Sequence, residues 1–403
     1  MKENFKRYLH LEEHVLLMIR AEFFIQLIGA SFFLILNIYL AKQGFLDTEI
    51  ANFISYRFLA VMLLAFPLGF YIKGRPLRPF FITGGLGVPI IGITLILAVQ
   101  NGWFKYLPVL FVLWGLSFTL FQVCSLPYIM RNTNVENQSH AISLNYATHS
   151  FGTIISGLII FFSAQFMREI DEGRILLVIS LFGFIGVYYL LKMKSDVVLP
   201  VKEKSYVMYD WRLLIKSILP TLIIAIGAGL TIPFINLFFF HIFEVDSSEF
   251  AFIGGVASLL VAIFSLSVPD FKKRLGFRKG ITYTQMLSVI ALIALASTEF
   301  FNQYWWSLYI AVIFYWLRTP LMNMAAPMTS ELTMNYVGAK NQEILSAIMA
   351  AIWSGSWFFS SQIFKVLKSI GLTYAYIFYI TALLYAFGIF LYYLLIMDYE
   401  RRK

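Results

Sequence analysis

Long apolar segments, repeated from one end of the chain to the other, restrict this sequence to a membrane environment. A helix that spans the hydrocarbon core of a bilayer needs roughly 20 apolar residues. Sixty per cent of the 403 residues are hydrophobic, only 13% are charged, and the mean hydropathy is +0.76. A soluble protein would expose much of this apolar surface to water. The twelve expected transmembrane segments of this all-α polytopic membrane protein are Val15–Leu40, Ile50–Ile72, Phe80–Val99, Tyr106–Met130, Ala141–Phe166, Ile175–Leu191, Leu213–Ile242, Phe250–Val268, Ile281–Phe300, Trp305–Thr329, Ile344–Val366 and Tyr374–Met397.

The basic residues predict how these segments are oriented. If the N-terminus is cytoplasmic, 22 of the 31 Lys and Arg residues lie on the cytoplasmic side, six lie outside and three lie within spans. Cytoplasmic loops of membrane proteins carry such an excess. We therefore expect both termini in the cytoplasm, and a bacterial inner (cytoplasmic) membrane as the location. The net charge of +9 then indicates attraction to the cytoplasmic lipid surface and no binding to nucleic acid.

Two parts of the chain, about half its length apart, have similar sequences. Ile28–Asn37 reads IGASFFLILN, and Ile226–Asn236 reads IGAGLTIPFIN. Both are followed about ten residues later by an acidic pair and an alanine, DTEIA at 47–51 and DSSEFA at 246–251, so the offset stays between 198 and 200. An ordered series of matches at nearly one offset indicates an internal duplication.

The longest polar stretch between spans lies at the midpoint of the chain. It covers Lys192–Arg212 and separates six expected spans from six others. We predict an N-terminal six-helix bundle (1–191), a cytoplasmic linker (192–212) and a C-terminal six-helix bundle (213–403). Because six is even, both copies enter the membrane in the same direction, which gives pseudo-symmetric parallel repeats.

Together these features resemble the major facilitator superfamily over almost the whole chain. The superfamily has a 6+6 arrangement, a basic loop after the second span that recurs after the eighth, and the loop motif G-x-x-x-D-R-x-G-R-[RK]. The first copy here, Gly69–Arg78, reads GFYIKGRPLR and keeps only the opening Gly and the closing Arg. The second copy, Pro269–Arg278, reads PDFKKRLGFR and keeps Arg274, Gly276 and Arg278. Lysine (Lys73 or Lys273) replaces the acid in both copies. The sequences around Ile226–Asn236 and RTPLMNMAAP at Arg318–Pro327 in the tenth span also look like those of a bacterial subgroup of this superfamily.

The resemblance implies a secondary transporter that works by alternating access, with the first and seventh helices facing each other across a central cavity. Asn37 and Asn236 then lie at matching depth in the outer half, and Pro233 loosens the seventh helix. Each amide can hydrogen-bond a transported solute. Equally, each can bridge neighbouring helices or cap a bend.

Charged residues inside membrane helices usually face protein or water, because burying them in lipid is costly. Glu22, Gln26 and Gly29 follow one another at i, i+4 and i+7 and form a polar stripe on the first helix. His149 on the fifth helix lies at about the depth of Glu22. The pair is a candidate for proton coupling. A static hydrogen-bonded pair, or no contact, is the alternative.

Arg318 lies near the middle of the tenth span, with Tyr315 one turn before it. A permanent guanidinium charge at that depth needs a carboxylate, carbonyl groups or an anionic substrate as its partner. Arg57 in the second span is assigned to snorkelling or to a structural pair. Trp353 and Trp357 are four residues apart on the eleventh span, and they either line an apolar substrate site or pack against lipid and protein.

The repeat also suggests a cytoplasmic gate. Arg131 and Glu331 occupy equivalent places, 200 residues apart, at the ends of the fourth and tenth spans. Arg274 and Arg278 lie nearby in the second copy of the loop motif. We predict an ion pair from Glu331 to one of them, with Arg274 preferred. A solvated helix-end charge is the alternative.

Enzymatic functions find little support in the sequence. His241 and Asp246 match the H-x-x-x-x-D spacing of acyltransferases, but a five-residue gap occurs easily by chance. The chain contains no GxxxxGK[ST] phosphate loop. It also has no clustered His/Cys metal set, and its one cysteine, Cys124, cannot form an intrachain disulfide. We expect no enzyme activity, no catalytic residues, no metal and no cofactor.

The sequence therefore predicts a monomeric, proton-coupled secondary transporter for a small organic or amphipathic solute, with an anionic solute among the options. Its partners are the lipid bilayer, the solute and protons. Export by antiport is favoured over uptake because the spans are strongly aromatic, with 18% Phe, Trp and Tyr in the chain. A nutrient uptake symporter, or a non-transporting membrane receptor or assembly protein on the same fold, is the alternative.

Overall fold

The computed structural model describes residues 11–72, 75–166, 171–194, 210–338 and 341–402, and all regular structure in them is helical. The helices are α2 (Glu13–Lys42), α3 (Asp47–Tyr71), α4 (Arg78–Gln100), α5 (Leu107–Asn132), α6 (Val135–Phe166), α7 (Glu172–Lys192), α8 (Trp211–Thr231), α9 (Ile235–Phe243), α10 (Ser247–Leu266), α11 (Val268–Ser297), α12 (Ser307–Val337), α13 (Gln342–Ser369) and α14 (Tyr374–Arg402), with short 3-10 helices at Phe104–Tyr106, Ile232–Phe234 and Thr298–Phe301.

Contacts divide the chain into two compact units. Unit 1 contains residues 1–45, 56–204 and 246–255, and unit 2 contains 46–55, 205–245 and 256–403. The first turns of α3 therefore belong to unit 2, and those of α10 belong to unit 1. The expected division into 1–191 and 213–403 did not anticipate this exchange of helix starts. Most of the expected linker, 192–212, lies outside the described residues.

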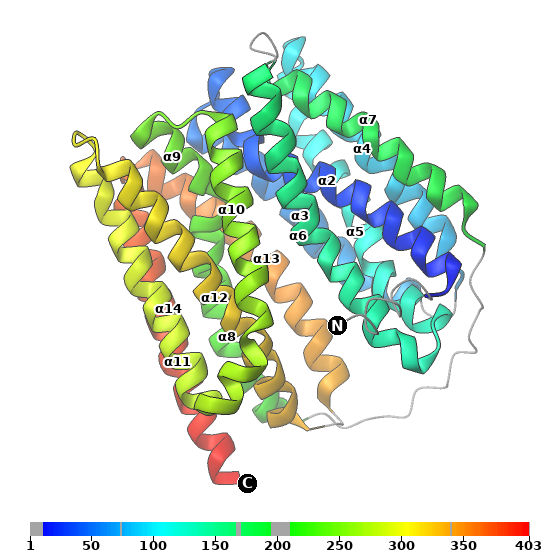
Figure 1. The fold of residues 1–403 in the computed structure, drawn as a ribbon, viewed down its shortest axis with the longest axis vertical. Helices are drawn as coiled ribbons and strands as arrows, with labels where there is room; N and C mark the ends of the chain where they lie inside the picture. Colours follow the sequence, from blue (N-terminus) through cyan, green and yellow to red (C-terminus); the bar gives the residue numbers. More distant parts are fainter. Residues whose placement is uncertain (1–10, 73–74, 167–170, 195–209, 339–340, 403) are drawn as a thin grey trace. The chain divides into compact units, whose positions relative to one another are not determined.

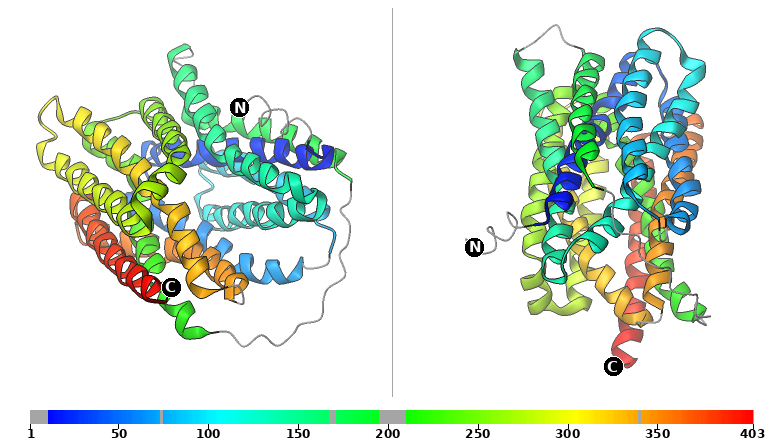
Figure 2. Two further views of the ribbon diagram at one scale, coloured as in Figure 1. Left: turned by 60° about the horizontal axis from the view of Figure 1, so that its bottom comes forward. Right: turned by 90° about the vertical axis from the view of Figure 1, so that its right-hand side faces the viewer.

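The helices of each unit pack in the same order. In unit 1, α5 packs on α4, α4 on α7, α7 on α2 and α2 on α6. In unit 2 the corresponding order is α12, α11, α14, α8 and α13. Helices of one unit run alongside each other over much of their length (Figures 1 and 2). The duplicated sequence thus corresponds to a duplicated packing arrangement.

Close helix contacts in each unit depend on small residues. A methyl group at Gly152 of α6 would lie 3.2 Å from the backbone of Gln26 on α2. In unit 2, a methyl group at Gly229 of α8 would lie 2.7 Å from Ser360 of α13. Any larger side chain would push these helices apart, since packing between membrane helices relies on such close approach.

The membrane-spanning character of the helices follows from their length and composition. Ten stretches of the described chain are long and apolar enough to cross a bilayer, with α8 and α9 forming one bent stretch around Pro233. The expected spans Trp305–Thr329 and Ile344–Val366 correspond to α12 and α13, which are not among the ten. Arg318 and a run of Ser, Gln and Lys residues make these two helices more polar. The count of twelve spans therefore stays a prediction.

Candidate functional site

A buried carboxyl group forms the centre of a polar cluster in unit 1. Glu22 of α2 is 1% exposed. Its Oε2 accepts a hydrogen bond from Ser125 Oγ at 2.7 Å, and its Oε1 accepts one from Gln26 Nε2 at 3.2 Å. The side chain of Asn145 provides a further hydrogen bond. Neutral donors from α2, α5 and α6 thus compensate for the burial of the carboxylate.

His149 of α6 belongs to the same cluster. Its Nε2 lies 3.7 Å from Glu22 Oε1 and 3.3 Å from Gln26 Nε2. The close contact at Gly152 and a 2.9 Å hydrogen bond from Ser156 Oγ to the Leu27 carbonyl position α6 against α2. The two titratable groups differ in exposure, with 45% of the His149 side chain accessible against 2% of Glu22. This arrangement can pass a proton between an accessible imidazole and a buried carboxyl group.

Unit 2 contains a buried guanidinium group. Arg318 of α12 is 5% exposed, and its Nη2 donates to the Tyr385 hydroxyl on α14 at 2.9 Å. Ser288 on α11 donates to the Arg318 carbonyl oxygen at 3.0 Å and holds the backbone in place. Arg318 Nε has no hydrogen-bond partner, and no carboxylate lies within 4.0 Å of the side chain among the described residues. The buried guanidinium therefore has an unused Nε–H donor, which suits an anion.

Tyr315 lies one turn from Arg318 on α12 and is 8% exposed. Its ring packs against Phe239 of α9, with 5.7 Å between the ring centroids. With Tyr385, whose ring centroid is 5.8 Å from the Arg318 guanidinium carbon, it gives the charge an aromatic surround.

Arg57 on α3 has a different environment in unit 1. Its guanidinium carbon lies 4.4 Å from the ring centroid of Trp114 and 5.3 Å from that of Phe118, both on α5. The ring faces stabilise the cation. The Arg57 carbonyl also lies where a side chain at Gly115 would clash, so the two helices are in close contact. The structural role that we expected for Arg57 is consistent with these contacts.

The remaining predicted substrate residues do not join either cluster through a described contact. Asn37 on α2 and Asn236 on α9 are buried, and Asn236 Oδ1 accepts a hydrogen bond from the Leu237 amide at 2.9 Å, near the bend after Pro233. Trp353 is 42% exposed on α13. Trp357 on α13 lies in the close contact with α8, because a methyl group added at Gly229 would lie 3.1 Å from its Cα. Their roles in substrate binding stay predictions.

The predicted partner of Glu331 requires a correction. Lys272 Nζ lies 2.5 Å from both Glu331 carboxylate oxygens, whereas Arg274 forms no ion pair among the described residues. Two residues along a helix turn the side chain by about 200°, so Lys272 and Arg274 point in opposite directions. Beyond Gly276, where φ is +67° and the helix breaks, Arg278 donates to the Tyr393 hydroxyl at 2.7 Å.

Arg131 at the equivalent place in unit 1 contacts the chain just after α3. It donates to the carbonyl oxygens of Arg75 at 2.7 Å and Ile72 at 3.3 Å. Ile72 and Lys272 are equivalent in the repeat. The same contact is therefore made by a cation and backbone carbonyls in one unit, and by an acid and a lysine in the other.

Sequence reasoning missed two groups of charged residues at helix ends. In unit 2, Asp47 accepts hydrogen bonds from Tyr374 at 2.5 Å and pairs with His241 at 2.9 Å and Lys368 at 3.3 Å. In unit 1, Lys42 pairs with Glu172 at 2.5 Å and with Asp246. His241 thus contacts Asp47 and not Asp246, which removes the basis for an acyltransferase pair. The near-repeat of Lys42 and Asp47 as His241 and Asp246 was the available signal.

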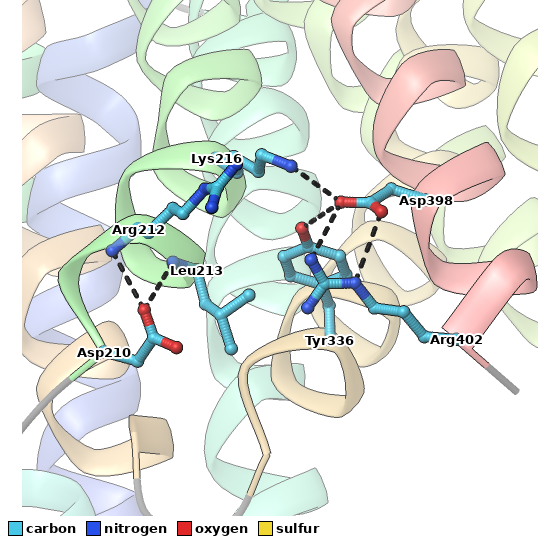
Figure 3. Close-up of polar contacts among 7 residues, drawn as sticks. All are labelled: Asp210, Arg212, Leu213, Lys216, Tyr336, Asp398 and Arg402. Carbon is cyan, nitrogen blue, oxygen red and sulfur yellow. Dashed lines mark hydrogen bonds and ion pairs between the residues drawn. The ribbon is translucent and has the colours of Figure 1, made fainter.

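A third group was also missed, at the end of unit 2 where α8 begins (Figure 3). Asp398 of α14 accepts hydrogen bonds from the Tyr336 hydroxyl at 2.6 Å and from Lys216 Nζ at 2.9 Å, and Arg402 joins it at 3.2 Å. Asp210 caps α8 because its Oδ1 accepts hydrogen bonds from the Arg212 and Leu213 amides. Asp398 is the first charged residue of an otherwise apolar helix and begins its charged end, DYERR, which was the available signal. These contacts tie α8, α12 and α14 together.

Comparisons with known proteins agree with this architecture. A sequence model of the Major Facilitator Superfamily matches residues 21–361. No curated protein sequence matches the chain. Among solved structures, the nucleoside transporter NupG has a TM-score of 0.72 at 13% identity, covering 95% of this chain and 99% of that one.

Two other structures are similar to a comparable degree. A D-xylose-proton symporter has a TM-score of 0.72 at 13% identity, with 94% of this chain and 96% of that one covered. A bacterial homologue of the iron transporter ferroportin in its inward-facing state has a TM-score of 0.69 at 14% identity, with 94% and 97% covered. At these identities the likeness shows the fold alone.

Proposed function

This chain belongs to the major facilitator superfamily, and from that premise we propose that it is a proton-coupled secondary transporter of small organic anions, with export by antiport favoured over uptake. The observation that carries the proposal is the Glu22–His149 cluster of unit 1. A transporter driven by a proton gradient needs a group that binds and releases one proton per cycle. The cluster offers a carboxyl group and an imidazole 3.7 Å apart, and the Gln26 amide nitrogen lies within hydrogen-bond distance of both.

The cluster can accommodate Glu22 in either protonation state. With the carboxylate charged, Ser125 and Gln26 donate to its two oxygens. When the carboxyl group is neutral, its burial no longer costs the desolvation of a charge. His149, which is more exposed, is the group through which a proton would reach or leave Glu22. Protonation or deprotonation of Glu22 would then alter the charge of the polar stripe on α2.

Arg318 supports an anionic substrate. A buried guanidinium that has one phenolic partner and an unused Nε–H is costly unless an acceptor completes it. A carboxylate or phosphate would supply that acceptor in bidentate geometry. The aromatic residues Tyr315 and Tyr385 beside it suit a substrate that also carries an apolar part.

We propose twelve spans with both termini in the cytoplasm of a bacterial inner membrane. The 22-to-6 bias of basic residues supports this orientation.

The test begins with a thermal-shift screen of organic anions on the purified protein at one acidic and one alkaline pH. A stabilising anion is then used in proteoliposomes with an imposed pH gradient. Glu22→Gln should abolish gradient-driven accumulation, while exchange between equal pools of substrate survives because exchange requires no net proton release. Glu13→Gln, at the exposed start of the same helix, is the matched control. Accumulation at the parental rate in Glu22→Gln would remove Glu22 from the coupling role.

A further inference from the structure

An apolar groove lies in unit 1 where α6 and α7 both pack on α2. It has a volume of about 320 Å³ and belongs to neither polar cluster. Phe23 and Phe24 of α2 form part of its floor, Phe151 and Ile155 of α6 line one wall, and Tyr189 of α7 lines the other.

Two glycine contacts bring the walls of the groove onto α2. Gly152 allows the close approach of α6, and Gly186 allows that of α7, where a methyl group would lie 3.0 Å from the Ala21 carbonyl oxygen. The groove is the space left between the two helices.

One cation lies in this apolar groove. Arg20 of α2 is exposed, and its guanidinium carbon lies 5.9 Å from the ring centroid of Tyr189, which in turn stacks on Phe24. The described residues place no carboxylate within 4.0 Å of Arg20. A ring face attracts the charge but accepts no hydrogen bond from the five N–H donors in the guanidinium plane. In a membrane, where water does not reach the hydrocarbon, such donors need an acceptor from a ligand or a lipid.

The length of the groove indicates what lies along it. Arg20 is seven residues from the start of α2, and Ile155 is next to Ser156, which bonds the Leu27 carbonyl. The groove begins one turn before Arg20, at Leu16, and the distance from Leu16 to the level of Leu27 is about 17 Å along the helix. Half of the hydrocarbon core is about 15 Å thick. The groove is therefore about as long as one leaflet is thick and is too short for a partner helix, which would cross both.

We propose that this groove binds a phospholipid of the leaflet that contains the N-terminal end of α2. The lipid phosphate accepts hydrogen bonds from Arg20, and one acyl chain follows Phe24 and Phe151 toward Ile155. An anionic headgroup such as phosphatidylglycerol fits best, because the groove contributes a positive charge and no negative one. The site is separate from the Glu22 cluster and does not depend on the proposed transport function.

The proposal can be tested with a phosphatidylglycerol that carries a photoactivatable diazirine at the end of one acyl chain. The full-length protein in detergent is titrated with this probe and irradiated, and the labelled peptides are mapped by mass spectrometry. We expect labels on α2 and α6 near Phe24, Phe151 and Ile155. Arg20→Gln should weaken the apparent affinity about ten- to a hundredfold, as expected for loss of a charge-assisted contact, and Arg20→Lys should weaken it less.

Two matched controls separate the site from general lipid contact. Arg174→Gln removes an exposed cation elsewhere in unit 1, and it should leave labelling unchanged. Ile155→Trp fills the end of the groove and should abolish labelling there, while Leu158→Trp, on an exposed position of the same helix, should not. Melting temperatures establish that each variant is folded. Leu16→Trp fills the other end of the groove and replaces Ile155→Trp should that variant fail to fold.

Several outcomes would overturn the proposal. Equal affinity in Arg20→Gln and the parent would show that the phosphate does not bind Arg20. Equal labelling by a diacylglycerol probe with the same chains would show an apolar contact without headgroup recognition. A change from dimer to monomer in Ile155→Trp would identify the occupant as a second copy of the chain.

Discussion

Lys42 at the end of α2 and His241 at the end of α9 occupy equivalent places in the repeat, 199 positions apart. Each pairs with an aspartate from the other repeat: Lys42 with Asp246, just before α10, and His241 with Asp47, the first residue of α3. Lys42 contacts Asp246 within unit 1, and His241 contacts Asp47 within unit 2. The exchange of helix starts between the units accounts for this crossed pairing. One of the two pairs uses a lysine ammonium group, and the other uses a histidine imidazole.

The two equivalent aspartates should contribute unequally to stability. The Asp47 side chain is 13% exposed and has three partners, whereas that of Asp246 is 51% exposed. Asp47→Asn should therefore lower the free energy of unfolding by about 1.5–3 kcal/mol, and Asp246→Asn by about 0–1 kcal/mol. Thermal unfolding in detergent measures both, with Glu244→Gln, an exposed acid in the same loop, as control. Equal losses from the two substitutions would show that burial of Asp47 has no consequence.

The Asp246 contribution should depend on pH in a defined direction. Burial raises the pKa of Asp246, but the hydrogen bond and charge of Lys42 and the Ser247 amide outweigh it and hold the pKa below its usual 3.8. A group whose pKa is depressed in the folded state stabilises above its unfolded pKa, and this stabilisation is lost as the pH falls through the folded pKa. The difference in melting temperature between the parent and Asp246→Asn should be the same at about pH 7 and about pH 5, and shrink below about pH 4. A difference that grows on acidification would contradict the assignment.

Arg318 should bind the substrate anion through its charge and its geometry. Arg318→Ala should weaken binding of the anion found by thermal shift about ten- to a hundredfold, and Arg318→Lys less, because lysine keeps the charge and loses the planar donor set. Tyr385→Phe removes the described hydrogen-bond partner of the Arg318 guanidinium and is the matched probe of positioning. Isothermal titration in detergent gives the affinities. If Arg318→Ala unfolds while the ligand protects the remaining folded fraction normally, Arg318 is a structural residue.

Parts of this arrangement follow from helical spacing, and others require tertiary structure. Glu22 and Gln26 share a helix face by their four-residue separation, and counting depth along two helices was sufficient to place His149 beside them. The predicted partner of Glu331 was wrong because Lys272 and Arg274 point in opposite directions on one helix, and Lys272 is the residue that faces Glu331. For Arg278, the positive φ of Gly276 redirects the chain, and a sequence pattern does not report φ. The pairing of Asp47 with His241 was out of reach because it depends on which helix starts exchange between units. The function of the Glu22 cluster stays a prediction.

The Lys272–Glu331 pair should act as a cytoplasmic gate. Both residues are partly exposed, at 32% and 46%, so in a static structure their pair would contribute only about 0–1 kcal/mol. Gating requires the pair to differ between two conformations, since only differential contacts shift a conformational equilibrium. Glu331→Gln should therefore raise labelling of a cysteine introduced on the cytoplasmic side of α12, in a Cys124→Ser background. Adding Lys272→Gln should raise it little further, because the pair is already broken, whereas Arg274→Gln should not reproduce the effect. Labelling of Glu331→Gln at the parental rate would leave Glu331 as an ordinary surface acid.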